Sequence, residues 1–209
     1  MQKLIIFPYN GNGREALDCI SAEFECIGFA DDAIEKQGKT DSGHEVFSRD
    51  IFDRYPEAKV LAVPGSPVTF RGRRAVLEGL SIAHDRFATI IHTRANVSSK
   101  AVIGRNVLIM AGVVLTSNAR VGDHVCILPN SVVHHDSRVG DFTLVGSNVT
   151  VAGGTTIGMN CYIGSGTSMI NGITVGDGTL IGMGAVVLRD VAPGTKMAGV
   201  PARSIGGPA

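Results

Sequence analysis

Residues 121–146 read VGDHVCILPNSVVHHDSRVGDFTLVG, and an aliphatic residue stands at every sixth position of this stretch. The same phase continues on both sides without a slip over seventeen positions: Ile91, Val97, Ile103, Ile109, Leu115, Val121, Ile127, Val133, Val139, Val145, Val151, Ile157, Ile163, Met169, Val175, Ile181 and Val187. The fifth residue of each hexad is small or aliphatic, and glycine often follows the aliphatic position. Such a short fixed period predicts a solenoid, with both the aliphatic and the small position facing inward.

The pattern resembles the hexapeptide-repeat acyltransferases, which implies a left-handed parallel β-helix with three hexads in each triangular coil. Connections between parallel strands are nearly always right-handed, so a left-handed β-helix is an exception to this rule. With three hexads per coil, residues 18 apart stack at about 4.8 Å, the spacing of neighbouring strands. His135 then shares a column with Ser117, Gly153 and Asn171.

Composition limits the class of protein. The chain has 209 residues, 44% of them apolar, and its formal net charge is zero. It is long enough to bury a core in one or two domains, and its charge predicts no nucleic-acid or anionic-membrane partner. No apolar run reaches the about 18 residues of a membrane span. The four cysteines lack CxxC spacing and no signal peptide is apparent, so we expect a cytoplasmic protein with free thiols.

Residues 1–90 follow a different pattern, which predicts a Rossmann-like α/β half-fold. Apolar strands are expected at KLIIF (3–7), CIGFA (26–30) and KVLAV (59–63), with helices over 14–24, 48–55 and from the PGSP turn to about residue 83. The GNGREA stretch follows the first strand and offers backbone N–H groups to a phosphate, while the acidic pair after the second strand suits a ribose or base. We therefore expect three parts: a nucleotide-binding βαβ domain (1–90), a β-helix (91–192) and a C-terminal tail (193–209).

Two adjacent histidines interrupt the repeat. His135 is the third residue of its hexad, near an expected corner, so its side chain should point away from the core. His134 stands where other coils carry glycine, and Asp136 follows the pair. A solvated surface histidine is the simplest interpretation; an acid–base role is favoured by Asp136 and by Gly153 in the next coil.

Three motifs stand out along the chain: PYNGNGREA with GFADD, the central HHDSRVGDF, and AGVPARSI near the C-terminus. In these motifs the chain resembles the bacterial nucleotide-sugar N-acetyltransferases, a family that includes relatives of sialic-acid O-acetyltransferases. The resemblance covers nearly the whole chain. It implies transfer of an acetyl group from acetyl-CoA to the amino group of a UDP- or GDP-linked amino sugar.

The resemblance also implies roles for the residues around the histidine pair. His135 matches the family's general base, with His134 as its rival, and Asp136 matches the acid beside it. An amine that attacks a thioester must lose a proton, and imidazole accepts one near neutral pH. Gly153 matches the glycine whose N–H stabilises the oxyanion. Two family residues are replaced here, an asparagine by Leu128 and a histidine by Leu144, although Asn130 stands close to the first.

Ligand contacts are implied in the same way. Acetyl-CoA in the family runs along the β-helix between subunits of a homotrimer, at positions that match Leu144, Ser165 and Met183, and Lys196 and Arg203 stand near the C-terminal motif for its phosphates. The substrate contacts of the family match a set on the N-terminal domain: Asn10, Gly11, Asn12, Asp31, Asp32 and Gly65. Pro8 and Tyr9 replace the usual Gly-Ala, so the preferred base or sugar is left open.

Three other functions compete. An O-acetyltransferase acting on a sialic acid or another sugar would use the same base. A zinc β-helix carbonic anhydrase needs three histidines with paired spacing, which His124, His134 and His135 lack, so no metal is expected. A structural or ice-binding solenoid would show regular threonine ladders on one outer face, and the outer positions here vary too much.

Overall fold

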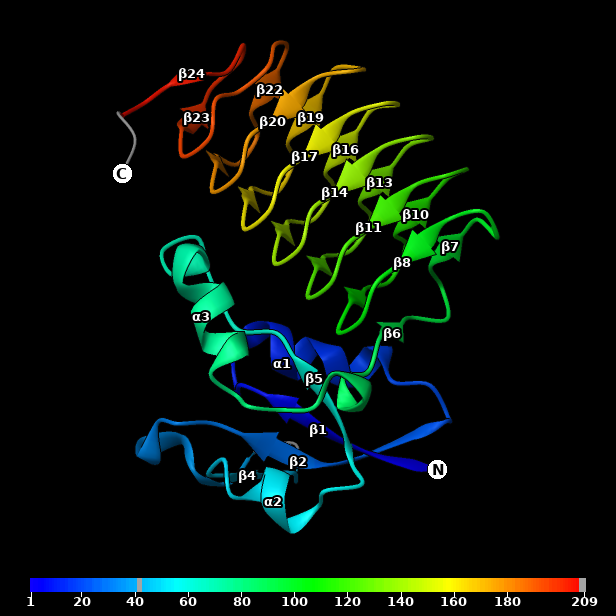
Figure 1. Cartoon of the computed structure of the whole chain (residues 1–209), viewed down its shortest axis with the longest axis vertical. Helices are drawn as coiled ribbons and strands as arrows, with labels where there is room; N and C mark the ends of the chain where they lie inside the picture. The colour runs from blue at the N-terminus through cyan, green and yellow to red at the C-terminus, as the bar shows by residue number, and fades with distance from the viewer. Residues whose placement is uncertain (41–42, 207–209) are drawn as a thin grey trace.

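The computed structural model describes residues 1–40 and 43–206 and has two parts, an N-terminal open sheet and a column of stacked coils. Figure 1 shows the coils rising away from the sheet toward the C-terminus, with α3 (Arg73–Glu78) where the two parts meet. The junction between the two parts decides which residues of the sheet and of the coils lie close together.

The N-terminal sheet has five strands in the order β3-β4-β2-β1-β5. Their bounds are β1 Gln2–Phe7, β2 Phe24–Ala30, β3 Gly38–Lys39, β4 Glu45–Phe47 and β5 Lys59–Ala62. β1 lies between β2 and β5 and pairs parallel with both. The apolar run of β1 is buried because layers cover both faces of this central strand. The expected β-α-β arrangement is confirmed, whereas β3 and β4 were not predicted.

The helices are shorter than the sequence predicts. Their bounds are α1 Gly11–Glu15, α2 Ile51–Arg54 and α3 Arg73–Glu78, with 3-10 turns η1 Ala16–Cys19, η2 Ile34–Lys36, η3 Phe70–Gly72 and η4 His84–Arg86. The helix expected over 14–24 instead begins at Gly11, because the Asn10 side chain accepts a hydrogen bond from the Gly13 N–H at 2.7 Å. The α-helix ends at Glu15 and the 3-10 turn η1 continues it to Cys19, since the chain becomes extended at Ile20 on its way to β2.

The coils form three sheets of mainly parallel strands, here called the first, second and third walls. The first wall contains β7 Asn96–Val97, β10 Val114–Leu115, β13 Val132–Val133, β16 Thr150–Val151, β19 Ser168–Met169 and β22 Val186–Val187. The second contains β8 Val102–Ile103, β11 Arg120–Val121, β14 Arg138–Val139, β17 Thr156–Ile157 and β20 Thr174–Val175. The third contains β6 Ile90–Ile91, β9 Leu108–Ile109, β12 Cys126–Ile127, β15 Leu144–Val145, β18 Tyr162–Ile163, β21 Leu180–Ile181, β23 Lys196–Ala198 and β24 Arg203–Ser204.

Register within the walls follows the predicted period. Val133 pairs with Leu115 on one side and with Val151 on the other, each 18 residues away. The aliphatic position of each hexad fills the centre of the column and is buried from Ile109 to Val187. Ile91 is an exception with 38% exposure, at the open end of the column. The inward-facing pattern is therefore confirmed along the stack apart from its first turn.

Polar residues at the fifth hexad position are buried and hydrogen-bonded to the next coil. The Thr143 hydroxyl donates to the Gly158 carbonyl at 2.9 Å and accepts from the Cys161 N–H at 3.0 Å. Ser131 makes the equivalent contacts with Gly146 and Val149. These internal hydroxyls satisfy corner backbone groups that water cannot reach.

The N-terminal part packs on the outer face of the third wall. One apolar cluster joins strands of the open sheet, through residues such as Phe29 and Leu61, to Leu108, Cys126 and Leu144 of the third wall. Arg71 reaches across the junction, with its Nη2 donating to the Gly194 carbonyl at 3.0 Å. The two parts therefore share a continuous buried contact.

The C-terminal segment, expected to be a tail, contributes two strands to the third wall. β23 pairs parallel with β21, and β24 turns back antiparallel onto β23. At the other boundary, β6 begins at Ile90 and pairs with β9. The division at residues 90 and 192 stays a prediction.

Candidate active site

A corner turn between the first and second walls carries the histidine pair. His135 and Asp136 follow β13, and their side chains are 61% and 58% exposed. Asp136 has a positive φ of 60°, a left-handed conformation that Asp and Asn adopt more readily than most residues. The predicted outward direction of His135 is confirmed.

The His135 ring is oriented from two sides. Its Nδ1 lies 2.9 Å from Asp136 Oδ2. A neutral imidazole that donates from Nδ1 to a carboxylate leaves Nε2 as the acceptor. On the other side, a Cβ built on Gly153 would lie 2.5 Å from both Nε2 and Cε1 of His135. The ring therefore lies directly over Gly153, which only a residue without a side chain permits. The predicted trio of His135, Asp136 and Gly153 is brought together in one corner.

Asn118 joins this corner from the preceding coil. Its Nδ2 donates to Asp136 Oδ1 at 2.9 Å. The pKa of Asp136 is lowered, first by this hydrogen bond and then by the one with His135. The Asp136 carboxylate is thus ionised at neutral pH and has a partner on each oxygen.

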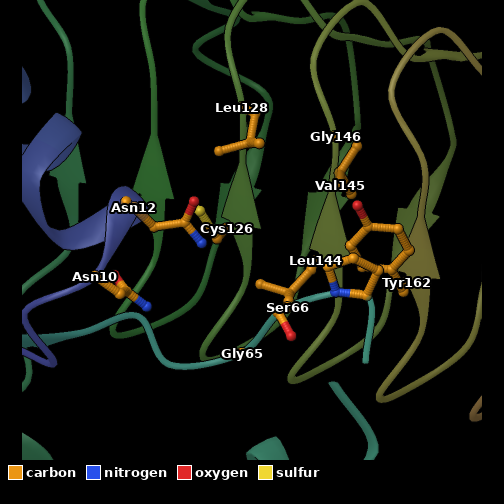
Figure 2. A pocket seen from close by; sticks show the side chains of 12 residues that line it. Asn10, Asn12, Gly65, Ser66, Cys126, Leu128, Leu144, Val145, Gly146 and Tyr162 are labelled. Carbon is orange, nitrogen blue, oxygen red and sulfur yellow. The ribbon is translucent and has the colours of Figure 1, made fainter. Parts of the chain in front are cut away.

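A second site lies where the N-terminal sheet meets the third wall. It is a cavity of about 260 Å³, with Asn10, Gly11, Asn12, Gly65, Ser66 and Pro67 on one side and Cys126, Leu128, Leu144, Val145, Gly146 and Tyr162 on the other. Figure 2 shows Asn10 and Asn12 on one flank and Tyr162 with Val145 and Gly146 on the opposite flank. Four of the six predicted substrate residues line it, together with Leu144 from the predicted CoA set.

The walls of the cavity have defined chemistry. The Asn10 side chain is committed to the backbone, since its Nδ2 also donates to the Val63 carbonyl at 3.2 Å. Gly11 has open space where a side chain would point. Burial raises the pKa of the Cys126 thiol to about 12, so this thiol is protonated and is not a nucleophile. The cavity offers a ligand the backbone around Gly11 and Gly65, the polar side chains of Asn12 and Tyr162, and the apolar outer side of the third wall.

The acidic pair does not line the cavity. Asp31 is buried, and its carboxylate accepts from the Tyr9 N–H at 3.0 Å, the Ala33 N–H at 2.9 Å and Lys36 Nζ at 3.0 Å. Asp32 forms a two-pronged ion pair with Arg49 at 2.6 and 2.7 Å. Asp31 therefore holds the loop that carries Tyr9 and Asn10, and substrate contact by either acid stays a prediction.

Ser165 and Met183, two of the three residues predicted to contact CoA, stack in one column at the corner between the third and first walls. Ser165 Oγ accepts from the Ser147 N–H at 3.0 Å, and Met183 is 74% exposed. Gly146, in the lining of the cavity, precedes this corner. The column therefore runs beside the mouth of the cavity.

Within one chain the two sites are separate. The cavity lies on the third wall, whereas His135 lies at the corner between the first and second walls, the corner opposite the third wall in a three-walled coil. The structure thus groups the predicted residues into a base corner and a cavity with an adjoining column, and does not bring the two together in a single subunit.

Comparison with protein families identifies the repeat. The model of the family "Bacterial transferase hexapeptide (six repeats)" matches residues 100–135, 118–153, 136–171 and 154–189. Residues 100–189 therefore carry the repeat of the bacterial hexapeptide transferases. Among curated proteins, no sequence matches this transferase.

Solved structures share the fold of this transferase along its whole length. The acetyltransferase domain of PglB from Neisseria gonorrhoeae FA1090, in complex with acetyl coenzyme A, is 26% identical, with a TM-score of 0.85 over 98% of this chain and 99% of that chain. A mutant of perosamine N-acetyltransferase from Caulobacter crescentus, in complex with CoA and GDP-perosamine, is 24% identical, with a TM-score of 0.84 over 99% and 98%. WeeI from Acinetobacter baumannii AYE is 24% identical, with a TM-score of 0.81 over 98% and 100%. The transferase therefore has the expected fold, an N-terminal α/β part and a left-handed β-helix.

Several cavity residues were not predicted from the sequence, although a signal was present. The outward residues of the third wall are Leu108, Cys126, Leu144, Tyr162 and Leu180, whereas the second wall carries Val102, Arg120, Arg138, Thr156 and Thr174 at the same place. A wall that is apolar on its outer face must be covered. This contrast would have pointed to the third wall as the docking face and to Tyr162 as part of the cavity.

Neither a metal-binding cluster nor a membrane-spanning helix is found among the described residues. Within residues 1–40 and 43–206, no three His, Cys, Asp or Glu side chains gather in an arrangement that suits a metal ion. In the same part of the chain, every helix is too short or too polar to span a bilayer.

Proposed function

We propose that this transferase moves an acetyl group from acetyl-CoA to the amino group of a nucleotide-linked amino sugar. The observation that carries the proposal is the His135–Asp136 pair, whose Nδ1 contact of 2.9 Å leaves Nε2 over Gly153 on an exposed corner of a hexapeptide β-helix. The likeness to the PglB domain with bound acetyl coenzyme A supports the donor.

His135 acts as the base in this mechanism. Acetyl-CoA supplies an activated acetyl thioester. As the sugar amine forms its bond to the carbonyl carbon, Nε2 of His135 accepts the proton that the nitrogen loses. When the carbon–sulfur bond breaks, the imidazolium returns that proton to the departing sulfur. Asp136 stabilises the imidazolium between these two steps, as the acid of a hydrolase triad does. No covalent bond to the protein is formed.

Gly153 has two roles in the same step. Its missing side chain gives the His135 ring room, and its backbone N–H is the proposed donor to the oxyanion. A backbone donor aimed at the developing oxyanion stabilises the transition state more than the ground state.

The cavity on the third wall is the proposed acceptor site. Gly11, Asn12 and Gly65 present backbone to the nucleotide, and Leu144 and Tyr162 face the sugar. The outward column of Ser165 and Met183 passes beside the cavity mouth and suits an extended donor. Lys196 and Arg203 are candidates for its phosphates.

A homotrimer completes the site in this proposal. The base corner and the cavity face different directions in one chain, so each cavity must meet the base corner of a neighbouring copy. Large apolar side chains remain exposed on the β-helix: Met159, Ile170, Met183 and Leu188 have exposures between 41% and 74%. Sedimentation should show a trimer, and a fully active monomer would contradict this arrangement. The cytoplasm, where acetyl-CoA and nucleotide sugars are both found, is the proposed compartment, and all four cysteines are free thiols.

The test is CoA release from acetyl-CoA with a panel of UDP- and GDP-linked sugars. Each amino sugar is paired with the analogue that carries a hydroxyl at the same carbon. We expect release with an amino sugar and not with its hydroxyl partner, and we expect no release by His135→Ala. Release with the hydroxyl sugars alone would assign an O-acetyltransferase, and release with neither class would reject the proposal.

A further inference from the structure

The carboxylate that orients His135 is itself held by a residue one coil away. Asp136 Oδ2 contacts His135 Nδ1 at 2.9 Å, and Asp136 Oδ1 accepts from Asn118 Nδ2 at 2.9 Å. The two contacts use different oxygens and come from different coils. They form a continuous relay from Asn118 through Asp136 to His135.

This relay matters because the acid is exposed. The Asp136 side chain is 58% exposed, so water competes for both oxygens and the carboxylate is free to turn about its side-chain torsions. Asn118 lies in a corner turn whose backbone is tied to the next coil, since the Asp136 N–H donates to the Ser117 carbonyl at 3.1 Å. An amide donor on this fixed turn restricts the carboxylate to one orientation.

We propose that Asn118 is a positioning residue for acetyl transfer: it fixes the Asp136 carboxylate so that His135 keeps its proton on Nδ1 and leaves Nε2 free for the amine. The proposal rests on the proposed function. Asn118 itself is not placed against the substrate, and it acts only through Asp136.

A purely structural role for Asn118 makes a different prediction. Its φ is 62°, and asparagines at other corners, such as Asn130 and Asn148, share this left-handed conformation. If only the backbone mattered, Gly or Asp at position 118 would serve as well as Asn, because both adopt this conformation readily. If the amide donor matters, neither Gly nor Asp at position 118 will replace Asn without loss of activity.

The first experiment compares Asn118→Gly and Asn118→Asp with the parent enzyme. Both variants keep the corner conformation, and both lose the donor to Asp136. We expect kcat to fall about tenfold, in line with the loss of a hydrogen bond to a charged group, with KM for both substrates changed less than about twofold. Unchanged kcat in Asn118→Gly would overturn the proposal.

A double-mutant cycle separates positioning from a general effect. In an Asp136→Ala background, Asn118→Gly should lower kcat no further, because the group through which Asn118 acts is gone. An equal loss in both backgrounds would overturn the proposal and assign Asn118 a structural role.

A readout without substrate keeps this inference distinct from the proposed function. Nitrogen-15 NMR of the imidazole nitrogens reports which nitrogen of His135 carries the proton. We expect the Nδ1–H form in the parent enzyme and in the control Asn148→Gly, which alters a corner of the same conformation elsewhere, and a mixture of tautomers in Asn118→Gly. If no acceptor supports CoA release, the proposed function fails while this measurement still decides the role of Asn118. An unchanged tautomer in Asn118→Gly would contradict it.

Discussion

The adjacent histidines differ in what surrounds their side chains, although they share one turn. His135 has the Asp136 carboxylate on Nδ1 and Gly153 beneath its ring. His134 is half-buried at the end of β13, and its backbone N–H donates to the Val151 carbonyl at 2.9 Å. Position within the turn, and not residue type, therefore distinguishes the surroundings of His135, the proposed base, from those of His134.

This difference gives a prediction for the pair. His135→Ala should lower kcat about 100-fold or more, the usual contribution of a positioned general base. His134→Ala should have a much smaller effect, and Asp136→Asn should fall between them because it keeps the shape of the contact and removes its charge. Steady-state kinetics with thermal melts to confirm folding would test the order. Equal losses for both histidines would point away from a single base.

A methyl group at Gly153 should act on the same ring. In Gly153→Ala the new Cβ would meet His135 ring atoms at 2.5 Å, so the ring must turn away from Asp136. We expect kcat to fall about 100-fold, as misplacement of a reacting group by about 1 Å can cause, with little change in melting temperature because only an exposed side chain has to move. Gly72→Ala is the control, since no atom lies within 4 Å of its new methyl. Normal turnover in Gly153→Ala would place the reacting ring elsewhere.

At the scale of elements, the junction between the two parts of the molecule contains a buried histidine. His124 stacks on Phe142 with ring centroids 4.9 Å apart, and its Nδ1 lies 2.9 Å from Asn106 Nδ2. The buried guanidinium of Arg73 donates to the His124 carbonyl. Burial, and then the charge of Arg73, lowers the pKa of His124 to about 4. The junction therefore holds this ring neutral.

The neutral ring makes stability depend on pH. An unfolded His124 binds a proton below its ordinary pKa of 6.5, whereas the folded one does so only near 4. Unfolding therefore takes up a proton between these values, and the free energy of unfolding should decrease as pH falls from 6.5 to 4 and then level off for this group. Urea unfolding of the parent and of His124→Asn, a residue that tolerates the positive φ of 59° at this corner, would test it. The variant should lose part of this slope, and identical slopes would contradict the assignment.

The elements divide into those that the sequence could predict and those that it could not. The hexad strands were predictable because the backbone period alone decides which side chains face inward, as Val133 and Val139 illustrate. The bounds of the first helix were not, because its start depends on the Asn10 cap and its end on where the chain becomes extended before β2. The stacking of His135 over Gly153 was predictable from their spacing of 18 residues, which places them in one column. Asn118 was missed because polar pairing between coils leaves no mark on the hydrophobic period.

At the scale of the whole molecule, the separation of base corner and cavity predicts complementation between inactive variants. Gly11→Phe should fill the cavity, since a side chain at Gly11 enters open space, and His135→Ala removes the base. Co-expressed, the two should regain activity if the proposed trimer is right, because a mixed trimer would contain sites with an intact cavity from one subunit and an intact His135 from another. Random assembly would make about one quarter of the sites intact.

Two controls apply to this experiment. Each variant expressed alone should be inactive, and the two purified variants mixed after each has assembled should also stay inactive. Activity in the co-expressed sample requires a site shared between subunits. If co-expression restores nothing while mixed oligomers form, the cavity and the base must serve each other within one chain.

The docking of the N-terminal sheet onto the third wall has a consequence for synthesis. The ribosome completes the sheet first, and its apolar face, with Phe29 and Leu61, is then covered only by residues of the N-terminal part such as Ala16 and Cys19. Its covering surface is made of Leu108, Cys126 and Leu144, which emerge one coil at a time. Each coil contacts only its neighbours, so the column can grow as it leaves the exit tunnel. The N-terminal domain of the nascent chain is therefore prone to aggregation through this apolar face until at least three later coils have been translated.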